Sequence, residues 1–130
     1  MDSKVKIANE YMDALRKGEI ERLFSYLSED VQIVGGSGAH YGKPELMQYF
    51  SHYESPYRDS ENIPVGTYTC GNTVILESVL KAVHVKEYMG IPPSNKPFKM
   101  PTMNLFEIKD GKITAYRQYQ NTKILLDLHK

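Results

Sequence analysis

The segment TVILESVLKAVHVKEYM, residues 73–89, decides the fold of this 130-residue chain. It is rich in the β-branched and apolar residues that favour strands, and Glu77 lies within an otherwise apolar run. It is far longer than the usual strand of roughly 5–6 residues. A strand of this length has to curl, and we expect a β-bulge within it. The segment therefore predicts a strongly curved sheet.

Shorter strands on both sides of this segment complete an antiparallel meander. VGTYTC (residues 65–70) leads into it through Gly71-Asn72, which suits a two-residue hairpin turn. After it, KPFKMPTMNLFEI (96–108) runs to Asp110-Gly111, a strong hairpin signal, and KITAYRQYQ (112–120) is the last strand. The second half of the chain is therefore predicted to form one antiparallel sheet.

Helical spacing dominates the first half of the chain. Apolar side chains recur every three or four positions over residues 8–15, and Asp2 or Ser3 can cap this helix. The same spacing returns over residues 20–27, and Pro44 suits the first turn of a third helix. Helices followed by a meander are typical of an α+β domain with helices on one face of a curved sheet. Such a sheet forms a cone, whose interior is a natural place for a pocket.

Composition restricts the class of protein. A length of 130 residues predicts a single domain, residues 1–130. Lys plus Arg and Asp plus Glu number 16 each, so no net charge attracts nucleic acid or an anionic membrane. No apolar stretch is long enough to span a bilayer, and the single cysteine, Cys70, excludes a disulfide and a multi-thiolate metal site. We therefore expect a cytoplasmic protein with no nucleic-acid partner, no membrane partner and no metal.

Several segments resemble a known protein family. They are HYGKPELMQYF (40–50), His84, GIPPSNKPF (90–98), NLFEIKDGKI (104–113) and AYRQYQN (115–121). Together they are similar to the SnoaL-like polyketide cyclase family, a group within the nuclear transport factor 2-like superfamily. The resemblance implies a homodimer and a cone-shaped, curved antiparallel sheet packed against N-terminal helices. In that fold, GIPPSNKPF is the turn at the mouth of the cone.

The resemblance also implies an activity. SnoaL-like enzymes work inside the cone with ionisable side chains and no metal or organic cofactor, so we expect a small-molecule cyclase or isomerase of secondary metabolism. Its substrate would be a mostly apolar, polyketide- or terpenoid-like molecule. The chain departs from the family at Gln118 and Asn121, which stand where related enzymes carry Asp. Because amides do not exchange protons at pH 7, epoxide hydrolysis is not expected, and a non-catalytic ligand-binding or protein-association module is the alternative.

The candidates for the chemistry are His84, Glu77, Asn104 and Gln118. His84 suits a general acid or base, although a strand-end histidine can equally be structural. Glu77 is either a pocket acid or the partner of Lys81 in an ion pair at a dimer interface. Strand parity places Glu77 and His84 on opposite faces, so they form a dyad only if a bulge intervenes. The amides of Asn104 and Gln118 can polarise a carbonyl or hold an enolate, but Asn104 can also bond a neighbouring strand.

The remaining candidates are expected to shape the cavity and bind the substrate. Most are tyrosines or apolar side chains, which suit an amphipathic pocket, and the sequence holds ten tyrosines and six methionines. The candidates are Tyr11, Leu15, His40, Tyr49, Tyr53, Phe98, Met100 and Tyr116. His40 lies in a glycine-rich segment that either covers the pocket opening or is an ordinary surface loop.

Overall fold

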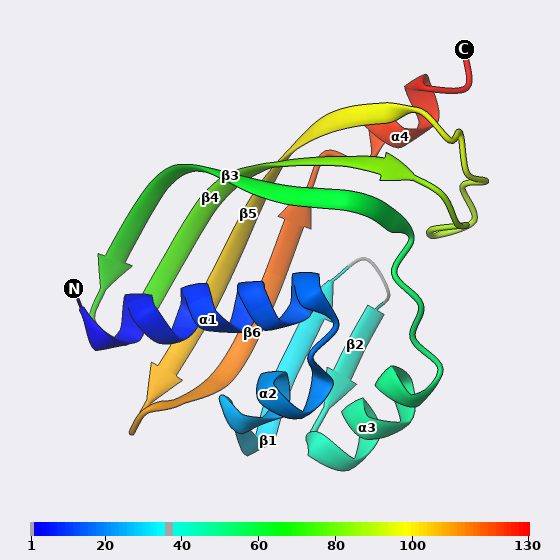
Figure 1. Ribbon diagram of the computed structural model, residues 1–130. Helices are drawn as coiled ribbons and strands as arrows, with labels where there is room; N and C mark the ends of the chain where they lie inside the picture. The colour runs from blue at the N-terminus through cyan, green and yellow to red at the C-terminus, as the bar shows by residue number, and fades with distance from the viewer. Residues whose placement is uncertain (1, 36–37) are drawn as a thin grey trace.

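The computed structural model describes residues 2–35 and 38–130 (Figure 1). Its helices are α1 (Ser3–Lys17), α2 (Ile20–Ser25), α3 (Lys43–Ser51) and α4 (Lys123–Asp127). Its strands are β1 (Leu27–Gly35), β2 (Gly38–Tyr41), β3 (Tyr57–Cys70), β4 (Thr73–His84), β5 (Pro97–Lys109) and β6 (Lys112–Gln120). The predicted order of helices followed by a meander is confirmed.

Helix α1 begins and ends where its sequence requires. The Asp2 side chain accepts a hydrogen bond from the backbone N–H of Lys4 at 2.7 Å and so caps the first turn. Gly18 follows the last turn with a left-handed backbone, at a φ of 72°. Ala8 and Tyr11 lie three residues apart on the buried face. This face presses against the sheet and forms one side of the interior.

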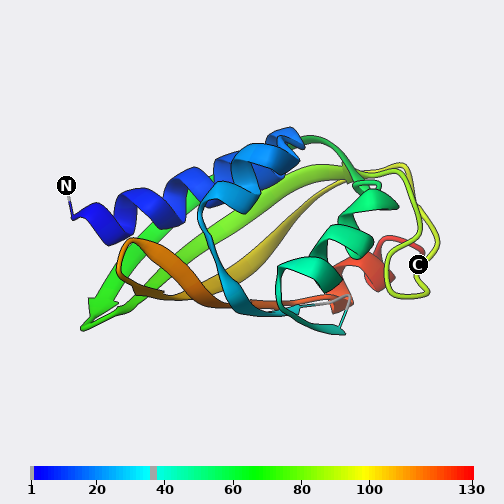
Figure 2. The same cartoon turned by 90° about the horizontal axis from the view of Figure 1, so that it is seen from below.

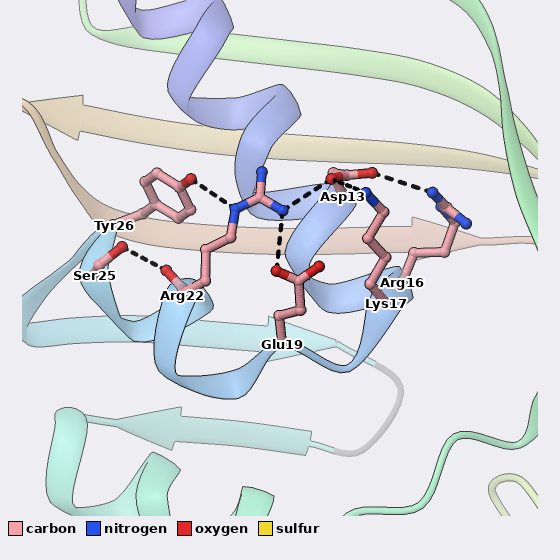
Figure 3. Close-up of polar contacts among 7 residues, drawn as sticks. All are labelled: Asp13, Arg16, Lys17, Glu19, Arg22, Ser25 and Tyr26. Atoms are coloured by element: carbon pink, nitrogen blue, oxygen red, sulfur yellow. Dashed lines mark hydrogen bonds and ion pairs between the residues drawn. The ribbon is translucent and has the colours of Figure 1, made fainter.

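An ion-pair cluster joins α1 to the short helix α2 (Figure 3). The carboxylate of Asp13 accepts a hydrogen bond from Arg22 at 2.9 Å. Arg16 and Lys17 each approach the same carboxylate to 3.1 Å. Arg22 also donates to the Tyr26 hydroxyl at 3.1 Å. Because of these cations, and of Arg22 above all, the pKa of Asp13 is lowered to about 2.

The strands form one open sheet in the order β2-β1-β6-β5-β4-β3. Neighbouring strands run antiparallel, apart from β1 and β6, which run parallel. Helix α1 crosses in front of the sheet in Figure 1, and Figure 2 shows the long strands curving beneath it. The predicted α+β fold, a curved sheet packed against N-terminal helices, is confirmed. The parallel pair of β1 and β6 differs from the purely antiparallel sheet that was predicted. It arises because β1 joins the meander beside its last strand.

The irregularities next to β4 lie in the edge strand β3. Two further register shifts lie elsewhere, between Leu27 and Gln32 where β1 pairs with β6, and between Glu107 and Ile108 where β5 pairs with β6. β4 pairs with β5 without a register shift, whereas β3 shifts between Arg58 and Glu61 and between Pro64 and Gly66. An edge strand tolerates bulges and a proline, because one of its sides has no partner to lose. The bulge predicted within residues 73–89 is therefore wrong. The neighbouring edge strand takes up the irregularity instead.

Apolar side chains of the described residues form two clusters. The larger cluster lies between α1 and the sheet and includes Tyr11 and Tyr116. The smaller one, called the distal cluster below, contains Leu80, Ala82, Ile91, Phe98, Met100 and Leu125. Ile91 reaches it from the connection between β4 and β5, where Tyr88 and Ile91 exchange backbone hydrogen bonds of 3.0 and 2.9 Å. The turn predicted at residues 90–98 is confirmed as part of this connection.

Candidate functional site

A cavity of about 580 Å³ lies between the helices and the concave face of the sheet. Its wall takes residues from α1, α3, β1, β2, β4, the start of β3, the end of β6, and the segments that follow α3 and β4. A space of this size accommodates a drug-sized molecule. The candidates that line it are Tyr11, Leu15, His40, Tyr49, Tyr53, Tyr116 and Gln118. The candidates that lie elsewhere are Glu77, His84, Phe98, Met100 and Asn104.

Phenol rings form much of the cavity wall. The tyrosines that contribute to it are Tyr11, Tyr49, Tyr53, Tyr57, Tyr88 and Tyr116. The rings of Tyr57 and Tyr88 stack with centroids 6.0 Å apart. Burial raises the pKa of Tyr11, Tyr57 and Tyr88 above its ordinary value. These hydroxyls therefore stay protonated at neutral pH and carry no charge.

Asn104 lies behind the wall and supports one of these phenols. Its side chain is buried, and its Oδ1 accepts a hydrogen bond of 2.7 Å from the Tyr116 hydroxyl. Its Nδ2 donates to the Thr102 hydroxyl at 3.5 Å. The expectation that Asn104 contacts substrate is thus corrected, because the buried amide is bonded to Tyr116 and does not line the cavity. Asn104 fixes the direction of the Tyr116 O–H bond.

His40 and Gln118 lie near Tyr116 on the sheet side of the cavity. β2 pairs His40 with Ile33, and β1 pairs Ile33 with Tyr116, so one row of the sheet holds all three. The His40 ring lies 4.5 Å from the ring of Tyr49 in α3. Gln118 follows two residues after Tyr116 and also lines the cavity. The structure thus places an imidazole, a phenol ring and an amide on the same side of the cavity, where the imidazole can move a proton and the amide can orient a carbonyl.

His40 belongs to a strand rather than to a covering loop. The glycine-rich segment that contains it was expected to be a loop, but β2 begins at Gly38 and is antiparallel to β1. Residues 36 and 37 of this segment lie outside the described residues. The strand geometry holds the half-buried His40 side chain at the wall.

His84 is fully buried next to the cavity but does not line it. It pairs across the sheet with Tyr57, and the two rings lie 6.1 Å apart. Within the described residues, neither ring nitrogen of His84 has a hydrogen-bond partner. Burial lowers the pKa of His84, and nearby His129 lowers it further. The Lys86 backbone raises this pKa in part, although it forms no hydrogen bond with the ring. The structure therefore separates His84 from the space where a substrate can lie.

Glu77 lies on the outer face of the sheet, away from the cavity. It alternates with the buried Leu76 along β4, and its Oε1 accepts a hydrogen bond of 3.0 Å from the Tyr68 hydroxyl. Because β4 has no bulge in its pairing with β5, Glu77 and His84 keep opposite faces. These two residues therefore do not form a dyad. The expectation that Glu77 is a pocket acid is also corrected, because its side chain does not line the cavity.

Two apolar candidates lie in the distal cluster instead of the cavity wall. Phe98 packs against the Tyr57 ring at 5.4 Å, and Met100 is fully buried. Both were expected to touch substrate, because their strand face is the inner one. The cavity ends before it reaches them. Conversely, the sequence did not single out Tyr57, Tyr88 or Gln120, which do line the cavity; only the excess of tyrosine pointed towards such a wall.

Acidic groups occupy only the exposed parts of the wall as far as the structure describes it. Its carboxylates there are Glu54 and Glu87, and Glu54 pairs with Lys86. Across residues 2–35 and 38–130, no group of three His, Cys, Asp or Glu side chains is arranged to hold a metal ion. In the same ranges, no helix combines the length and the apolar character needed to cross a membrane.

Comparison with protein families matches the SnoaL-like domain to residues 8–116 of the chain. The chain belongs to the SnoaL-like family. This confirms the family resemblance of the sequence. A search of curated proteins gives no significant match to this SnoaL-like chain.

Solved structures share the fold of this SnoaL-like chain. A Pseudomonas putida protein described as a "putative polyketide cyclase" has a TM-score of 0.81 at 20% identity, with 98% of each chain covered. A Silicibacter protein with the same description has a TM-score of 0.82 at 20% identity, covering 98% of this chain and 96% of its own. A Catenulispora acidiphila protein with a ketosteroid isomerase-like fold, in complex with trimethylamine, has a TM-score of 0.73 at 18% identity, covering 94% and 90%. At these identities the similarity shows the fold.

Proposed function

We propose that this SnoaL-like protein binds a mostly apolar, carbonyl-bearing molecule of polyketide or terpenoid type and catalyses its cyclisation or isomerisation. The wall of the cavity carries this proposal, because neutral phenols, an amide and an imidazole meet there in a space of about 580 Å³. Such a wall can hold a flexible molecule folded while a few polar groups orient its oxygen atoms. The polyketide cyclase description of two proteins with the same fold supports this class of reaction.

The proposed reaction needs one group that moves a proton. His40 is the half-buried imidazole of the wall, and it takes the role that the sequence suggested for His84. Its imidazole removes a proton from a carbon beside a carbonyl, and the resulting enolate carbon bonds to a second carbonyl carbon of the same molecule. The imidazolium then returns the proton to the new alkoxide. The Gln118 amide donates a hydrogen bond to the enolate oxygen.

Turnover of linear β-polyketone thioesters, followed by chromatography and mass spectrometry, tests this proposal. We expect cyclised product with the native protein and a rate lower by about a hundredfold in His40→Gln, whose affinity for the thioester is unchanged. His129→Gln changes a histidine outside the wall and is the matched control, with a native rate. Equal rates for His40→Gln and the native protein would contradict the role of His40. Failure of every thioester to bind would contradict the function itself.

A non-catalytic binding module is the second candidate, and one observation favours it. Gln118 and Asn121 occupy positions where related enzymes carry Asp, and the described carboxylates of the wall are exposed. An amide holds a ligand without exchanging protons. Tight binding of the thioesters with no cyclised product, in the same experiment, would favour this candidate over the enzyme.

We further propose that residues 1–130 act as one domain in a cytoplasmic homodimer. Tyr68, Met103 and Tyr119 expose large apolar surface on the sheet face opposite α1. Arg117 and Glu107 pair at 3.2 Å on the same face, which therefore carries both charges and suits a second copy of itself. The single thiol, Cys70, is compatible with a reducing compartment.

A further inference from the structure

We propose that Tyr88 binds a carbonyl oxygen of the ligand and that Gln120 positions its hydroxyl for this task. The inference rests on the proposed function, because it names the part of the wall that recognises the substrate. Tyr88 lies in the connection between β4 and β5, where it exchanges two backbone hydrogen bonds with Ile91. Its ring stacks on the Tyr57 ring at 6.0 Å, with an angle of 23° between the planes. Both the backbone and the ring of Tyr88 are thus held in place.

The contact with Gln120 leaves the Tyr88 hydroxyl free to act as a hydrogen-bond donor. The Nε2 of Gln120 donates to the Tyr88 Oη at 3.0 Å. Since an amide N–H can only donate, the phenol uses a lone pair in this contact and keeps its own proton for another partner. In the part of the chain that the structure describes, no group accepts that proton. Tyr88 and Gln120 are half-buried and line the cavity, so a ligand can reach the proton.

Two neighbouring phenols are less suited to this role. Tyr116 already donates its proton to Asn104 at 2.7 Å. The Tyr57 hydroxyl is buried and has no hydrogen-bond partner among the described residues, so its oxygen does not face the open space. Tyr88 also lies close enough to Tyr57 and Tyr116 to contribute to the raised pKa of both. Of these three phenols, Tyr88 is therefore the one whose proton is available to the cavity.

The geometry defines the chemical group that Tyr88 recognises. A protonated phenol with a free O–H matches an acceptor such as a ketone or ester carbonyl. In the proposed cyclisation this oxygen becomes an enolate, and a donor already aimed at it stabilises the developing charge without rearrangement. Burial favours the neutral phenol, which keeps the donor in place at neutral pH. Tyr88 thus selects substrates with a carbonyl at this end of the cavity.

Two probes that differ in one group test the inference: 2-acetylnaphthalene carries a carbonyl where 2-ethylnaphthalene carries a methylene. We expect Tyr88→Phe to weaken binding of the ketone about fivefold and to leave the hydrocarbon unaffected, because one neutral hydrogen bond is lost. Tyr119→Phe is the matched control, since Tyr119 is exposed outside the wall and its loss should change neither affinity. Native affinity for 2-ethylnaphthalene also shows that a variant keeps its cavity.

Gln120→Glu distinguishes a positioning role from a packing role. The carboxylate of this variant accepts the Tyr88 proton, so the ketone should lose affinity as in Tyr88→Phe although the hydroxyl remains. The carbonyl stretching frequency of bound 2-acetylnaphthalene should be lowered by the native protein and should rise again in both variants. If the native protein binds both probes and Tyr88→Phe changes neither the affinity ratio nor the frequency, this inference is wrong while the proposed function stands. If neither probe binds, both are wrong.

Discussion

The Tyr116 hydroxyl donates a hydrogen bond of 2.7 Å to the Oδ1 of Asn104, across the neighbouring strands β5 and β6. Both side chains are almost completely buried. The bond joins the cavity wall to the layer behind it, so the phenol and the amide are expected to depend on each other energetically. In the register of the two strands, Asn104 lies opposite Gln118 and diagonal to Tyr116.

Asn104→Leu is expected to lower the free energy of unfolding by about 1–3 kcal/mol, because the buried Tyr116 hydroxyl then keeps only the Met12 sulfur, at 3.7 Å, as an acceptor. Tyr116→Phe should cost less in the Asn104→Leu background than in the native protein, since the bond is already lost. Urea denaturation of the four proteins measures this cycle. Additive effects of the two substitutions would contradict an energetic coupling.

The stability of the protein is expected to fall when His84 becomes protonated. The unfolded chain protonates this imidazole at its ordinary pKa of about 6.5, whereas burial lowers the pKa in the folded state. The unfolded state therefore binds more protons just below pH 6.5, and stability decreases as pH falls, by at most about 1.4 kcal/mol per pH unit.

His84→Leu should remove this part of the pH dependence. The variant replaces a buried group whose two nitrogens have no partner in the described structure, so we expect near-native stability at pH 8 and a gain over the native protein at pH 5. Urea denaturation at pH 8, 6.5 and 5 provides the comparison. Parallel pH profiles for the two proteins would show that His84 does not titrate in this way.

Asp13→Asn is expected to loosen the contact between α1 and α2. The carboxylate is partly exposed, so its ion pairs are screened and the loss at pH 7 should be about 1 kcal/mol. The folded pKa of about 2 lies below the ordinary value of about 3.9, so this stabilisation exists above pH 4 and disappears as pH falls towards 2. Native and variant proteins should therefore converge in acid.

Asp127→Asn is the matched control for this prediction. Asp127 also pairs with lysines, Lys123 and Lys130, but both lie within or beside its own helix α4. Its loss should affect global unfolding less than the loss of Asp13, which joins two helices. An equal effect of the two substitutions would argue against a role of the cluster in Figure 3 in holding α2.

Met103→Glu tests whether the outer sheet face joins two copies. If two copies pair through this face, the new carboxylate of each copy would be buried in the interface without a partner. We therefore expect a dimeric native protein and a monomeric variant. Light scattering after size-exclusion chromatography measures the mass of each. Met47→Glu is the control, because Met47 is an exposed methionine of α3 on another surface. A native monomer, or a dimer in both variants, would rule out this interface.

Local patterns were sufficient to predict most of the meander. Gly71 and the pair Asp110-Gly111 adopt positive φ values, as two-residue hairpins require, and both turns lie where the sequence indicates. β2 was missed, because four residues beside a glycine-rich stretch show no usable period. The parallel pairing of β1 with β6 was missed as well, since it joins residues as distant as Gln32 and Ala115.

The cavity was predictable only in part. Strand parity correctly turned Tyr116 and Gln118 inward, because β6 keeps its register with β5 from Ala115 to Gln120. His84 shares the inner face of its strand, yet the connection that follows β4 buries it: Asn95 donates a backbone hydrogen bond of 2.8 Å to the His84 carbonyl. Tyr88 lies in that same connection. Neither outcome can be read from periodicity, because the direction of a side chain in an irregular segment depends on tertiary packing.

The parallel pair of β1 and β6 also affects the order in which the protein folds. Its partners are separated by most of the chain, so the half of the wall that holds His40 and Ile33 has no neighbour until β6 is available. Contacts this distant in sequence slow folding, because a long loop must close before they form. During synthesis on the ribosome, the apolar faces of α1 and β1 would stay exposed to solvent until the meander has been translated. The binding cavity is therefore expected to assemble in the last step of folding, and a chain stalled before β6 is a candidate for chaperone binding.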